Sequence, residues 1–288
     1  MKNHRKRIRK KPPWLKRRLP TGKQYENVRQ LLDKNCLHTV CQEAKCPNLW
    51  ECFTEGTATF LIMGDRCTRN CRFCAVEQGP LNPPDPEEPK RIAQAVQTLN
   101  LDYVVVTSVT RDDLPDGGAG HFAATIESIR KTNPDARVEV LIPDFQGSEP
   151  ALDLVLEAAP DVLNHNLETV KRLYPRVRPL AIYERSLALM KYAYANSAIP
   201  IKSGLMLGLG ESDDEVHEAL QDLLDNGCSL LTLGQYLQPS KSHLPVIDYI
   251  QPQMFESLRH SALAMGFKEV ASGPFVRSSY HAKELIGA

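Results

Sequence analysis

The distribution of apolar positions along the chain predicts an alternation of strands and helices. Short apolar runs rich in β-branched residues alternate with segments whose apolar residues recur every three or four positions. The predicted strands are 57–64, 102–110, 137–142, 161–167, 200–209 and 229–237. The predicted helices are 89–101, 121–131, 151–159, 184–196, 213–226 and 253–265, with Ser212 as an N-cap and Gly227 just after a helix end. Such alternation is typical of a parallel sheet with right-handed crossovers, and an open doubly wound sheet also fits it.

The position of polar residues favours a barrel over an open sheet. Polar side chains lie on or just after the predicted strands, at Thr107, Asn164, Asn166, Glu168, Lys202 and Gln235. In barrels the reactive groups gather at the carboxyl ends of the strands. We therefore predict an α/β protein built on a partial (β/α)6 barrel with parallel strands.

Two segments lie outside the regular alternation. Residues 1–55 contain a possible short helix at 24–33 and a segment with little periodicity at 36–55, which we expect to be rich in loops. The chain has strand character again after residue 268 and ends in a tail that contains Arg277-Ser278-Ser279-Tyr280. We expect three parts: an extension at 1–55, the barrel at 56–270, and a tail at 271–288. The extension and the tail are expected to close over the mouth of the barrel.

The composition of the chain indicates its cellular compartment. Hydrophobic residues make up 42% and charged residues 24% of the 288 positions, and no run approaches the roughly 20 apolar residues of a membrane helix. The amino terminus has no apolar signal-peptide core. These features predict a cytoplasmic enzyme without a membrane partner.

Residues 1–20 form a basic arm in front of an acidic body. They hold ten of the 35 Lys and Arg residues and no acidic residue, which leaves 25 basic against 35 acidic side chains in the rest. A solvated tail and an arm that steers an acidic partner are both open interpretations. The arm carries no aromatic interleaving and no Ser, so we expect neither nucleic-acid binding nor organellar targeting.

Seven of the eight cysteines fall within 39 consecutive residues, from Cys36 to Cys74. Clustered thiols in a long chain without a secretion signal indicate metal binding rather than disulfides. Cys36 fits no ligand pattern, and Cys228 is expected to be a buried thiol.

The first triplet, Cys67-x3-Cys71-x2-Cys74, directly follows the first predicted strand. Thiolates in such a loop suit a [4Fe–4S] cluster, and the missing fourth cysteine would leave one iron open to a ligand. A zinc site is the alternative, but zinc is usually held by four ligands in C-x2-C pairs.

The second triplet is Cys41-x4-Cys46-x5-Cys52, and its spacing also suits a cluster. The alternative is that these three residues are buried or redox-active thiols.

These motifs resemble known families. The pattern C-x3-C-x-aromatic-C, with Phe73 as the aromatic residue, resembles the radical S-adenosylmethionine superfamily. The two triplets together with Arg-Ser-Ser-Tyr resemble the lipoyl synthase family within it. Further matching stretches are Pro47-Asn48-x-x-Glu51-Cys52, residues 110–119 (Thr-Arg-Asp-Asp-Leu-Pro-Asp-Gly-Gly-Ala), 163–169 (Leu-Asn-His-Asn-Leu-Glu-Thr) and 234–239 (Gly-Gln-Tyr-Leu-Gln-Pro).

The resemblance implies two [4Fe–4S] clusters and two molecules of S-adenosylmethionine per product. The cluster on Cys67, Cys71 and Cys74 would bind S-adenosylmethionine and generate a 5′-deoxyadenosyl radical. The second cluster, on Cys41, Cys46 and Cys52 with Ser279 as fourth ligand and Ser278 as the fallback, would be the sulfur donor. The implied sulfurtransferase reaction inserts sulfur at carbons 6 and 8 of a protein-bound octanoyl-lysine.

The resemblance also implies partners: octanoylated lipoyl carrier domains (2-oxoacid dehydrogenase subunits and the glycine cleavage H protein), flavodoxin or ferredoxin as electron donor, and an iron–sulfur carrier. Cofactor contacts are predicted from Phe73, Asn164, Asn166, Glu168 and Lys202, with structural hydrogen bonding as the alternative for the strand-end residues. Another radical sulfur-inserting enzyme and a non-catalytic iron–sulfur or zinc protein are the competing interpretations.

Overall fold

One eight-stranded sheet organises the chain, with its strands in sequence order from β1 to β8. The computed structural model describes residues 11–16, 23–55 and 58–286. Strands β2 to β8 are mutually parallel, and β1 pairs antiparallel with β2. The strands are β1 (His38–Thr39), β2 (Thr59–Ile62), β3 (Tyr103–Ser108), β4 (Arg137–Leu141), β5 (Val162–Asn164), β6 (Ile201–Leu207), β7 (Leu230–Gln235) and β8 (Glu269–Gly273).

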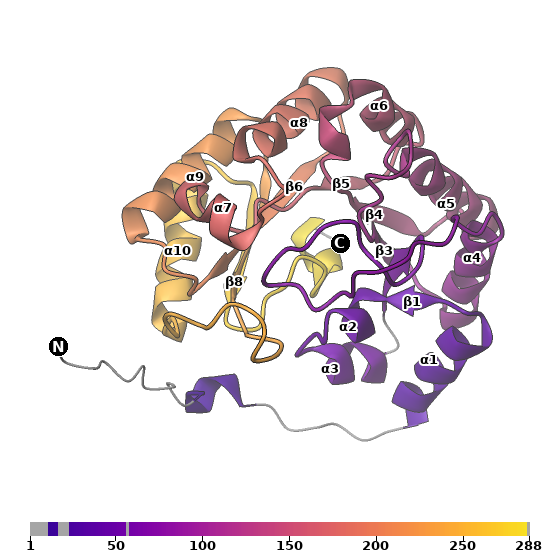
Figure 1. Cartoon of the computed structure of the whole chain (residues 1–288), viewed down its shortest axis with the longest axis horizontal. Coiled ribbons are helices and arrows are strands. Elements are labelled where there is room, and N and C mark those ends of the chain that lie inside the picture. The colour runs from indigo at the N-terminus through magenta and orange to yellow at the C-terminus, as the bar shows by residue number, and fades with distance from the viewer. Residues whose placement is uncertain (1–10, 17–22, 56–57, 287–288) are drawn as a thin grey trace.

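The helices follow the strands in the order expected for a barrel. The α-helices are α1 (Lys23–Lys34), α2 (Val40–Glu43), α3 (Leu49–Thr54), α4 (Glu88–Leu99), α5 (Ala119–Thr132), α6 (Glu149–Glu157), α7 (Tyr174–Val177), α8 (Tyr183–Asn196), α9 (Asp213–Asp225) and α10 (Pro252–Met265). Short 3₁₀ helices are η1 (Pro13–Leu15), η2 (Phe145–Gly147), η3 (Lys171–Leu173) and η4 (Ala282–Ile286). In Figure 1 the larger helices form an outer arc around the strands. The order is open, because among the described residues β8 does not pair with β1. The predicted partial α/β barrel is confirmed.

The amino-terminal and carboxy-terminal segments lie at the opening of this arc. Figure 1 shows α1, α2 and α3 on the side between β1 and β8, and the described part of the tail inside the arc. Leu15 in η1 is fully buried, whereas residues 1–10 and 17–20 of the basic arm lie outside the described residues. Residues 23–55 and the described part of the tail, 271–286, thus lie toward the same side of the barrel.

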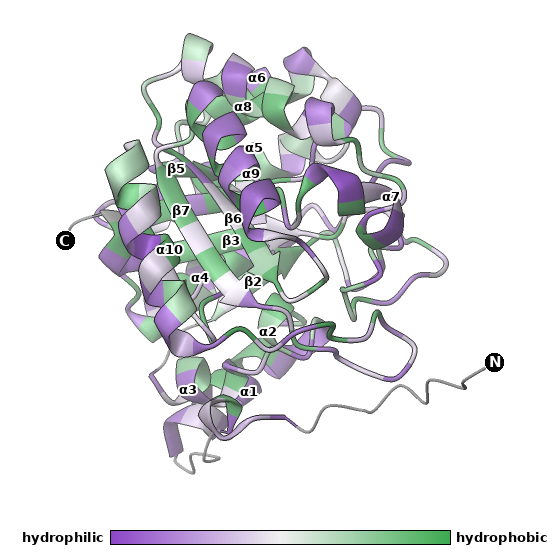
Figure 2. Cartoon of the chain, turned by 90° about the vertical axis from the view of Figure 1, so that its left-hand side faces the viewer, coloured by the Kyte–Doolittle hydropathy of each residue, from purple (hydrophilic) through white to green (hydrophobic). Residues whose placement is uncertain are grey.

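Helix α9 illustrates why these sequences form helices. Ser212 caps it by accepting a hydrogen bond from the backbone N–H of Glu215, whose side chain returns to the Ser212 N–H. Its buried residues are Val216, Ala219, Leu220 and Leu223, one apolar stripe at helical spacing. Gly227 follows with a φ of +84°, which favours glycine and ends the helix as predicted. Figure 2 shows the resulting pattern, with hydrophobic strands inside and polar helix surfaces outside.

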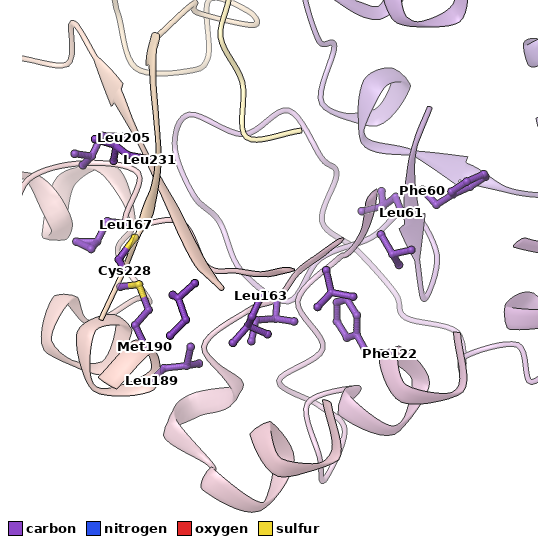
Figure 3. Close-up of a cluster of buried hydrophobic side chains, with 14 of the residues drawn as sticks. Phe60, Leu61, Phe122, Leu163, Leu167, Leu189, Met190, Leu205, Cys228 and Leu231 are labelled. Carbon is purple, nitrogen blue, oxygen red and sulfur yellow. The ribbon is translucent and has the colours of Figure 1, made fainter. Parts of the chain in front are cut away.

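The main core lies between the strands and the helices. Figure 3 shows buried side chains from both layers, including Phe122 on α5, Leu163 on β5 and Met190 on α8. Burying each such side chain stabilises the fold by roughly 1.5–3 kcal/mol. Cys228 belongs to this core, as predicted, and burial raises the pKa of its thiol to about 12.

The structure differs from the sequence-based expectation at both ends. Residues 36–55 contain β1, α2 and α3 rather than mainly loop, because helices of four and six residues are too short to produce a periodic pattern. Strand β8 is a seventh parallel strand, and it crosses the predicted boundary at residue 270. Within the described residues, no helix has the length and hydropathy needed to cross a membrane.

Candidate functional site

All six cysteines of the two triplets line one cavity of about 950 Å³. Cys67, Cys71 and Cys74 lie in the loop after β2, at the carboxyl end of that strand. The second triplet comes from the extension, with Cys41 in α2, Cys46 between α2 and α3, and Cys52 in α3. None of the six is in a disulfide. The fold therefore brings two separate sets of three thiols to the walls of a single space.

The first cysteine loop is held by backbone hydrogen bonds. The Cys67 N–H donates to the Glu77 carbonyl at 2.9 Å, and the Cys74 N–H donates to the Cys71 carbonyl at 3.0 Å. The Cys67 sulfur accepts hydrogen bonds from the N–H groups of Arg69 and Thr110 at 3.4 and 3.2 Å. Hydrogen bonds to a cysteine sulfur are one of the influences that set the reduction potential of a bound cluster.

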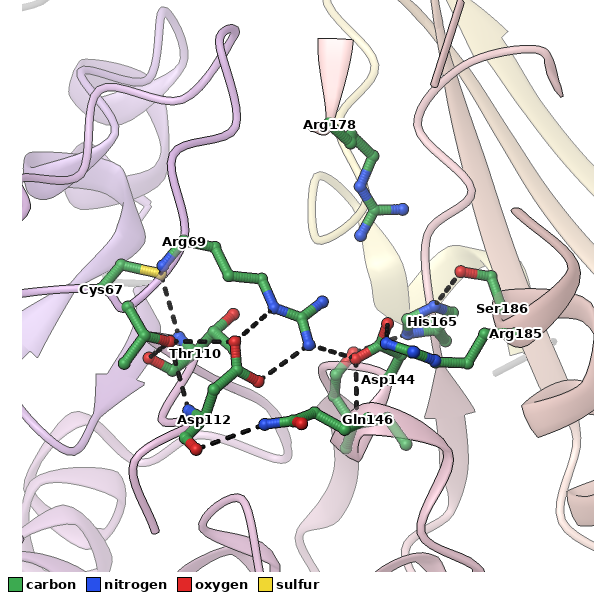
Figure 4. A network of polar contacts seen from close by, with 12 residues as sticks. Cys67, Arg69, Thr110, Asp112, Asp144, Gln146, His165, Arg178, Arg185 and Ser186 are labelled. Carbon is green, nitrogen blue, oxygen red and sulfur yellow. Dashed lines mark hydrogen bonds and ion pairs between the residues drawn. The ribbon is translucent and has the colours of Figure 1, made fainter. Parts of the chain in front are cut away.

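Arg69, between Cys67 and Cys71, ties this loop to two neighbouring loops of the barrel (Figure 4). Its guanidinium donates two hydrogen bonds to Asp112, at 2.7 and 2.8 Å, and one to Asp144 at 2.5 Å. Burial alone would raise the pKa of Asp144, but the hydrogen bond from Arg69 and its charge lower that pKa to about 2. Residues 110–119 match the family in sequence, and Asp112 in this stretch anchors Arg69 of the first cysteine loop.

Local hydrogen bonds hold the backbone around the second triplet. Thr39 caps α2 by accepting a hydrogen bond from the Gln42 N–H, and the Cys46 N–H donates to the Cys41 carbonyl at 3.0 Å. The Cys52 N–H donates to the Asn48 carbonyl at 3.0 Å. The three cysteines of the extension that these bonds hold all line the cavity.

The protonation of the thiols indicates what the cavity suits. Burial, with repulsion between neighbouring thiolates, raises the pKa of Cys41 and of Cys74 to about 12. Burial likewise raises the pKa of Cys71, against the opposing effect of Arg178. Ionising several neighbouring buried thiols therefore costs free energy unless a cation binds between them. Soft sulfur ligands favour iron–sulfur clusters or zinc. Both triplets fit an iron–sulfur cluster by their chemistry.

The carboxy-terminal tail enters the same cavity. Both Ser278 and Ser279 line it. The Ser278 hydroxyl accepts a hydrogen bond from Asn164 Nδ2 at 2.7 Å and donates one to Asn166 Oδ1 at 2.9 Å. Two residues of the barrel thus form hydrogen bonds with Ser278, which is adjacent to Ser279, the cluster ligand that the family resemblance implies.

The structure divides the predicted cofactor contacts into two groups. Phe73, Asn166 and Glu168 line the cavity, and burial raises the pKa of Glu168. Asn164 and Lys202 are not among the lining residues; both are fully buried and donate to Glu139, with Lys202 at 2.9 and 3.0 Å from its two oxygens. Lys202 is the second residue of β6, so it lies near the amino end of the strand, away from the mouth.

Arg178 is a cavity residue that the sequence did not single out. The residue is 9% exposed, and its Nη1 donates to the Asn166 and Leu167 carbonyls at 2.9 and 3.2 Å. It also contacts Cys71, where its charge lowers the pKa of the thiol. Its neighbours in sequence, Arg172 and Arg176, are exposed, so only the fold distinguishes it.

The fold and the three-cysteine loop define the class of protein. The model of the radical SAM superfamily matches residues 61–223, more than half of the chain, so the chain is a member of that superfamily. Streptococcus suis SuiB bound to S-adenosylmethionine has a similar fold, with a TM-score of 0.59 at 10% identity over 78% of this chain and 53% of that chain. HydG, a maturase of the [FeFe]-hydrogenase, has a TM-score of 0.57 at 17% identity over 85% of this chain and 66% of that chain. This chain spans less than two thirds of either structure, and both show the fold alone.

The particular family follows from closer relatives. The model of the N-terminal domain of lipoyl synthase matches residues 1–46. The lipoyl synthase of Caldicellulosiruptor saccharolyticus is 58% identical over 96% of this chain and 97% of its own length. That of Chlorobium limicola is 54% identical over 97% of this chain and 96% of its own length. The chain belongs to the lipoyl synthase family.

Proposed function

We propose that this chain is a lipoyl synthase, a sulfurtransferase that inserts two sulfur atoms at carbons 6 and 8 of an octanoyl group on a protein lysine. The observation that supports this function best is the shared cavity, because a radical generated at one triplet must act on a substrate that also reaches a sulfur source at the other. Both triplets and both tail serines line that one space.

Each triplet has its own proposed role. Cys67, Cys71 and Cys74 would hold a [4Fe–4S] cluster with one iron open, and Cys41, Cys46 and Cys52 would hold a second one with Ser279. When bound, the first cluster with S-adenosylmethionine supplies the hydrogen-abstracting radical, and the second supplies sulfur. Ser279 is the better candidate than Ser278, because Asn164 and Asn166 already engage the Ser278 hydroxyl.

The chain's own polar groups would bind and orient S-adenosylmethionine. Arg178 presents a buried guanidinium beside Cys71, which suits the carboxylate of the cofactor. Asn166 and Glu168, joined by a 3.1 Å hydrogen bond, offer amide and carboxyl oxygens at the mouth for ribose hydroxyls. Phe73 lines the cavity between Cys71 and Cys74 and would limit water beside the first triplet.

The same proposal assigns parts of the chain and partners. Residues 1–55 would carry the sulfur-donor site, 56–270 the radical barrel, and 271–288 the serine ligand. Octanoylated carrier domains, among them 2-oxoacid dehydrogenase subunits and the H protein, would present the substrate. Flavodoxin or ferredoxin would supply electrons, and an iron–sulfur carrier would rebuild the second cluster. The free cysteines suit a reducing compartment such as the cytoplasm.

Metal content and product analysis test the proposal together. The reconstituted protein should hold about eight irons per chain, the content of two [4Fe–4S] clusters. With S-adenosylmethionine, reductant and an octanoyl-lysine peptide it should form 5′-deoxyadenosine and a peptide heavier by two sulfur atoms. An iron–sulfur or zinc carrier without activity would leave S-adenosylmethionine intact, and another sulfur-inserting enzyme would leave the octanoyl peptide unchanged.

Two triple variants separate the clusters. Replacing Cys41, Cys46 and Cys52 by Ala should leave about four irons and 5′-deoxyadenosine formation, without sulfur insertion. Replacing Cys67, Cys71 and Cys74 should leave about four irons and abolish both activities. Cys36→Ser is the matched control, because Cys36 is exposed and belongs to neither triplet. Four or fewer irons in the unaltered protein would contradict the two-cluster proposal.

A further inference from the structure

Two sequence motifs from opposite ends of the chain contact each other at two points. Asn48 Nδ2 donates to the Phe275 carbonyl at 2.7 Å, and the Tyr280 hydroxyl donates to Glu51 Oε1 at 2.9 Å. The partners are 227 and 229 positions apart in sequence. Asn48 and Glu51 belong to the Pro-Asn-x-x-Glu-Cys stretch, for which the sequence suggested no role.

The two contacts enclose the serine pair. Ser278 and Ser279 lie between the two tail anchors, Phe275 and Tyr280. On the other side, Asn48 and Glu51 are three residues apart at the start of α3, so they lie on one face of that helix. Cys52 directly follows Glu51 in the sequence. The segment that carries the second triplet therefore holds the tail on both sides of its serines.

The tail is also packed against the barrel. Its backbone runs so close to β7 that a Cβ on Gly234 would lie 2.1 Å from the Val276 carbonyl oxygen. Ser278 reaches Asn164 and Asn166 at the end of β5. Asn48 is 1% exposed, so its bond to Phe275 is shielded from water. The tail thus lies between the barrel and the extension, with polar contacts to both.

We propose that Asn48 and Glu51 are positioning residues that dock the carboxy-terminal tail onto the segment of the second cysteine triplet. Their contacts to the tail would hold it there whether or not a cluster is bound. A serine oxygen is a hard, weak ligand for iron. A free chain end would lose conformational entropy whenever it bound, whereas a docked tail has lost that entropy on folding. The ligand role of Ser279 rests on the proposed function, but the docking of the tail does not.

Hydrogen exchange of the full-length chain tests the docking, with and without its clusters. The variants are Tyr280→Phe, which keeps the ring and removes the donor, Asn48→Ala, and the two combined. Tyr192→Phe is the matched control, because the Tyr192 hydroxyl also donates to a carboxylate, Asp153, on the outside of the barrel. Iron on the first triplet and exchange of α5 amides report that the barrel is intact.

In the cluster-free protein, amides of residues 276–282 should exchange about fivefold faster in each single variant and faster still in the double variant. Tyr192→Phe should leave them unchanged. The unaltered chain without clusters gives the decisive comparison. If its tail amides exchange as fast as those of an unfolded chain, the proposal is overturned, because the cluster and not the protein contacts would then order the tail. Unchanged exchange in the double variant would overturn it as well.

A second readout separates this inference from the proposed function. Ser279→Ala should change the Mössbauer spectrum of the second cluster without changing exchange of the tail. If the spectrum is unchanged while Tyr280→Phe and Asn48→Ala still accelerate exchange, the result supports the docking of the tail and contradicts the ligand role of Ser279. Chelators should also remove iron from the second cluster about fivefold faster in Tyr280→Phe, and equal rates would contradict the positioning role.

Discussion

The Arg69 guanidinium donates to the Asp144 carboxylate at 2.5 Å, and the two side chains are 4% and 0% exposed. This pair joins the first cysteine loop to the turn after β4. Asp144→Asn should lower the free energy of unfolding by about 3 kcal/mol, because one partner of a buried ion pair is lost. Chemical denaturation without oxygen measures it. Glu184→Gln, which removes an exposed pair with Lys171, is the control and should leave the midpoint unchanged.

Arg178 should affect cofactor binding more than the fold. Arg178→Met removes the cation beside Cys71, and the KM for S-adenosylmethionine should rise about 10–100-fold, the usual effect of losing a hydrogen bond to a charged group. Formation of 5′-deoxyadenosine at increasing cofactor concentration measures it. Arg176→Met changes an exposed arginine two positions earlier and should leave the KM unchanged. An unaltered KM in Arg178→Met would exclude the carboxylate role.

The Lys202–Glu139 pair should act through stability. Lys202→Met leaves a fully buried carboxylate without its cation and should cost about 3–5 kcal/mol of unfolding free energy. Combining it with Glu139→Gln removes both charges and should recover much of the loss. The double variant should also keep the KM for S-adenosylmethionine. A raised KM in a double variant of restored stability would show that Lys202 contacts the cofactor.

His165 makes stability depend on pH. Burial lowers its pKa from 6.5 to about 4, and the neutral ring bonds the Ile142 carbonyl and Ser186 at 2.9 Å each. The carbonyl only accepts, so Nδ1 carries the proton. Between pH 6.5 and 4 the unfolded chain binds the extra proton and the folded one does not, so stability falls as the pH falls.

From pH 7.5 to 5.5 the loss from His165 should be about 1.3 kcal/mol, and His165→Gln should remove that part of the pH dependence. Denaturation at both pH values measures it. Asp144 contributes nothing in this range, because its contribution is lost only below pH 3.8, where the unfolded carboxyl binds a proton that the folded one, with its pKa of about 2, does not. An equal slope in the variant would contradict the prediction.

The alternation of strands and helices was predictable because it depends on local periodicity. Six predicted strands correspond to β2 through β7, and the Ser212 and Gly227 signals mark the ends of α9. Strand β1 was not predictable, because two residues contain no pattern. Polar residues near the predicted strands indicated only part of the cavity lining. Asn166 and Glu168 line the cavity, whereas Lys202 lies near the opposite end of its strand.

The sequence by itself determined the two cysteine sets, because the ligands of each lie within one short segment, and spacing there limits which sulfurs can meet. Only the tertiary structure decided that both sets share one cavity with Ser278 and Ser279. It alone brought Arg178 to Cys71, and Asn48 and Glu51 to a tail more than 200 positions away. Such contacts depend on how far the sheet curves and where its ends lie, and neither property is encoded in a local pattern.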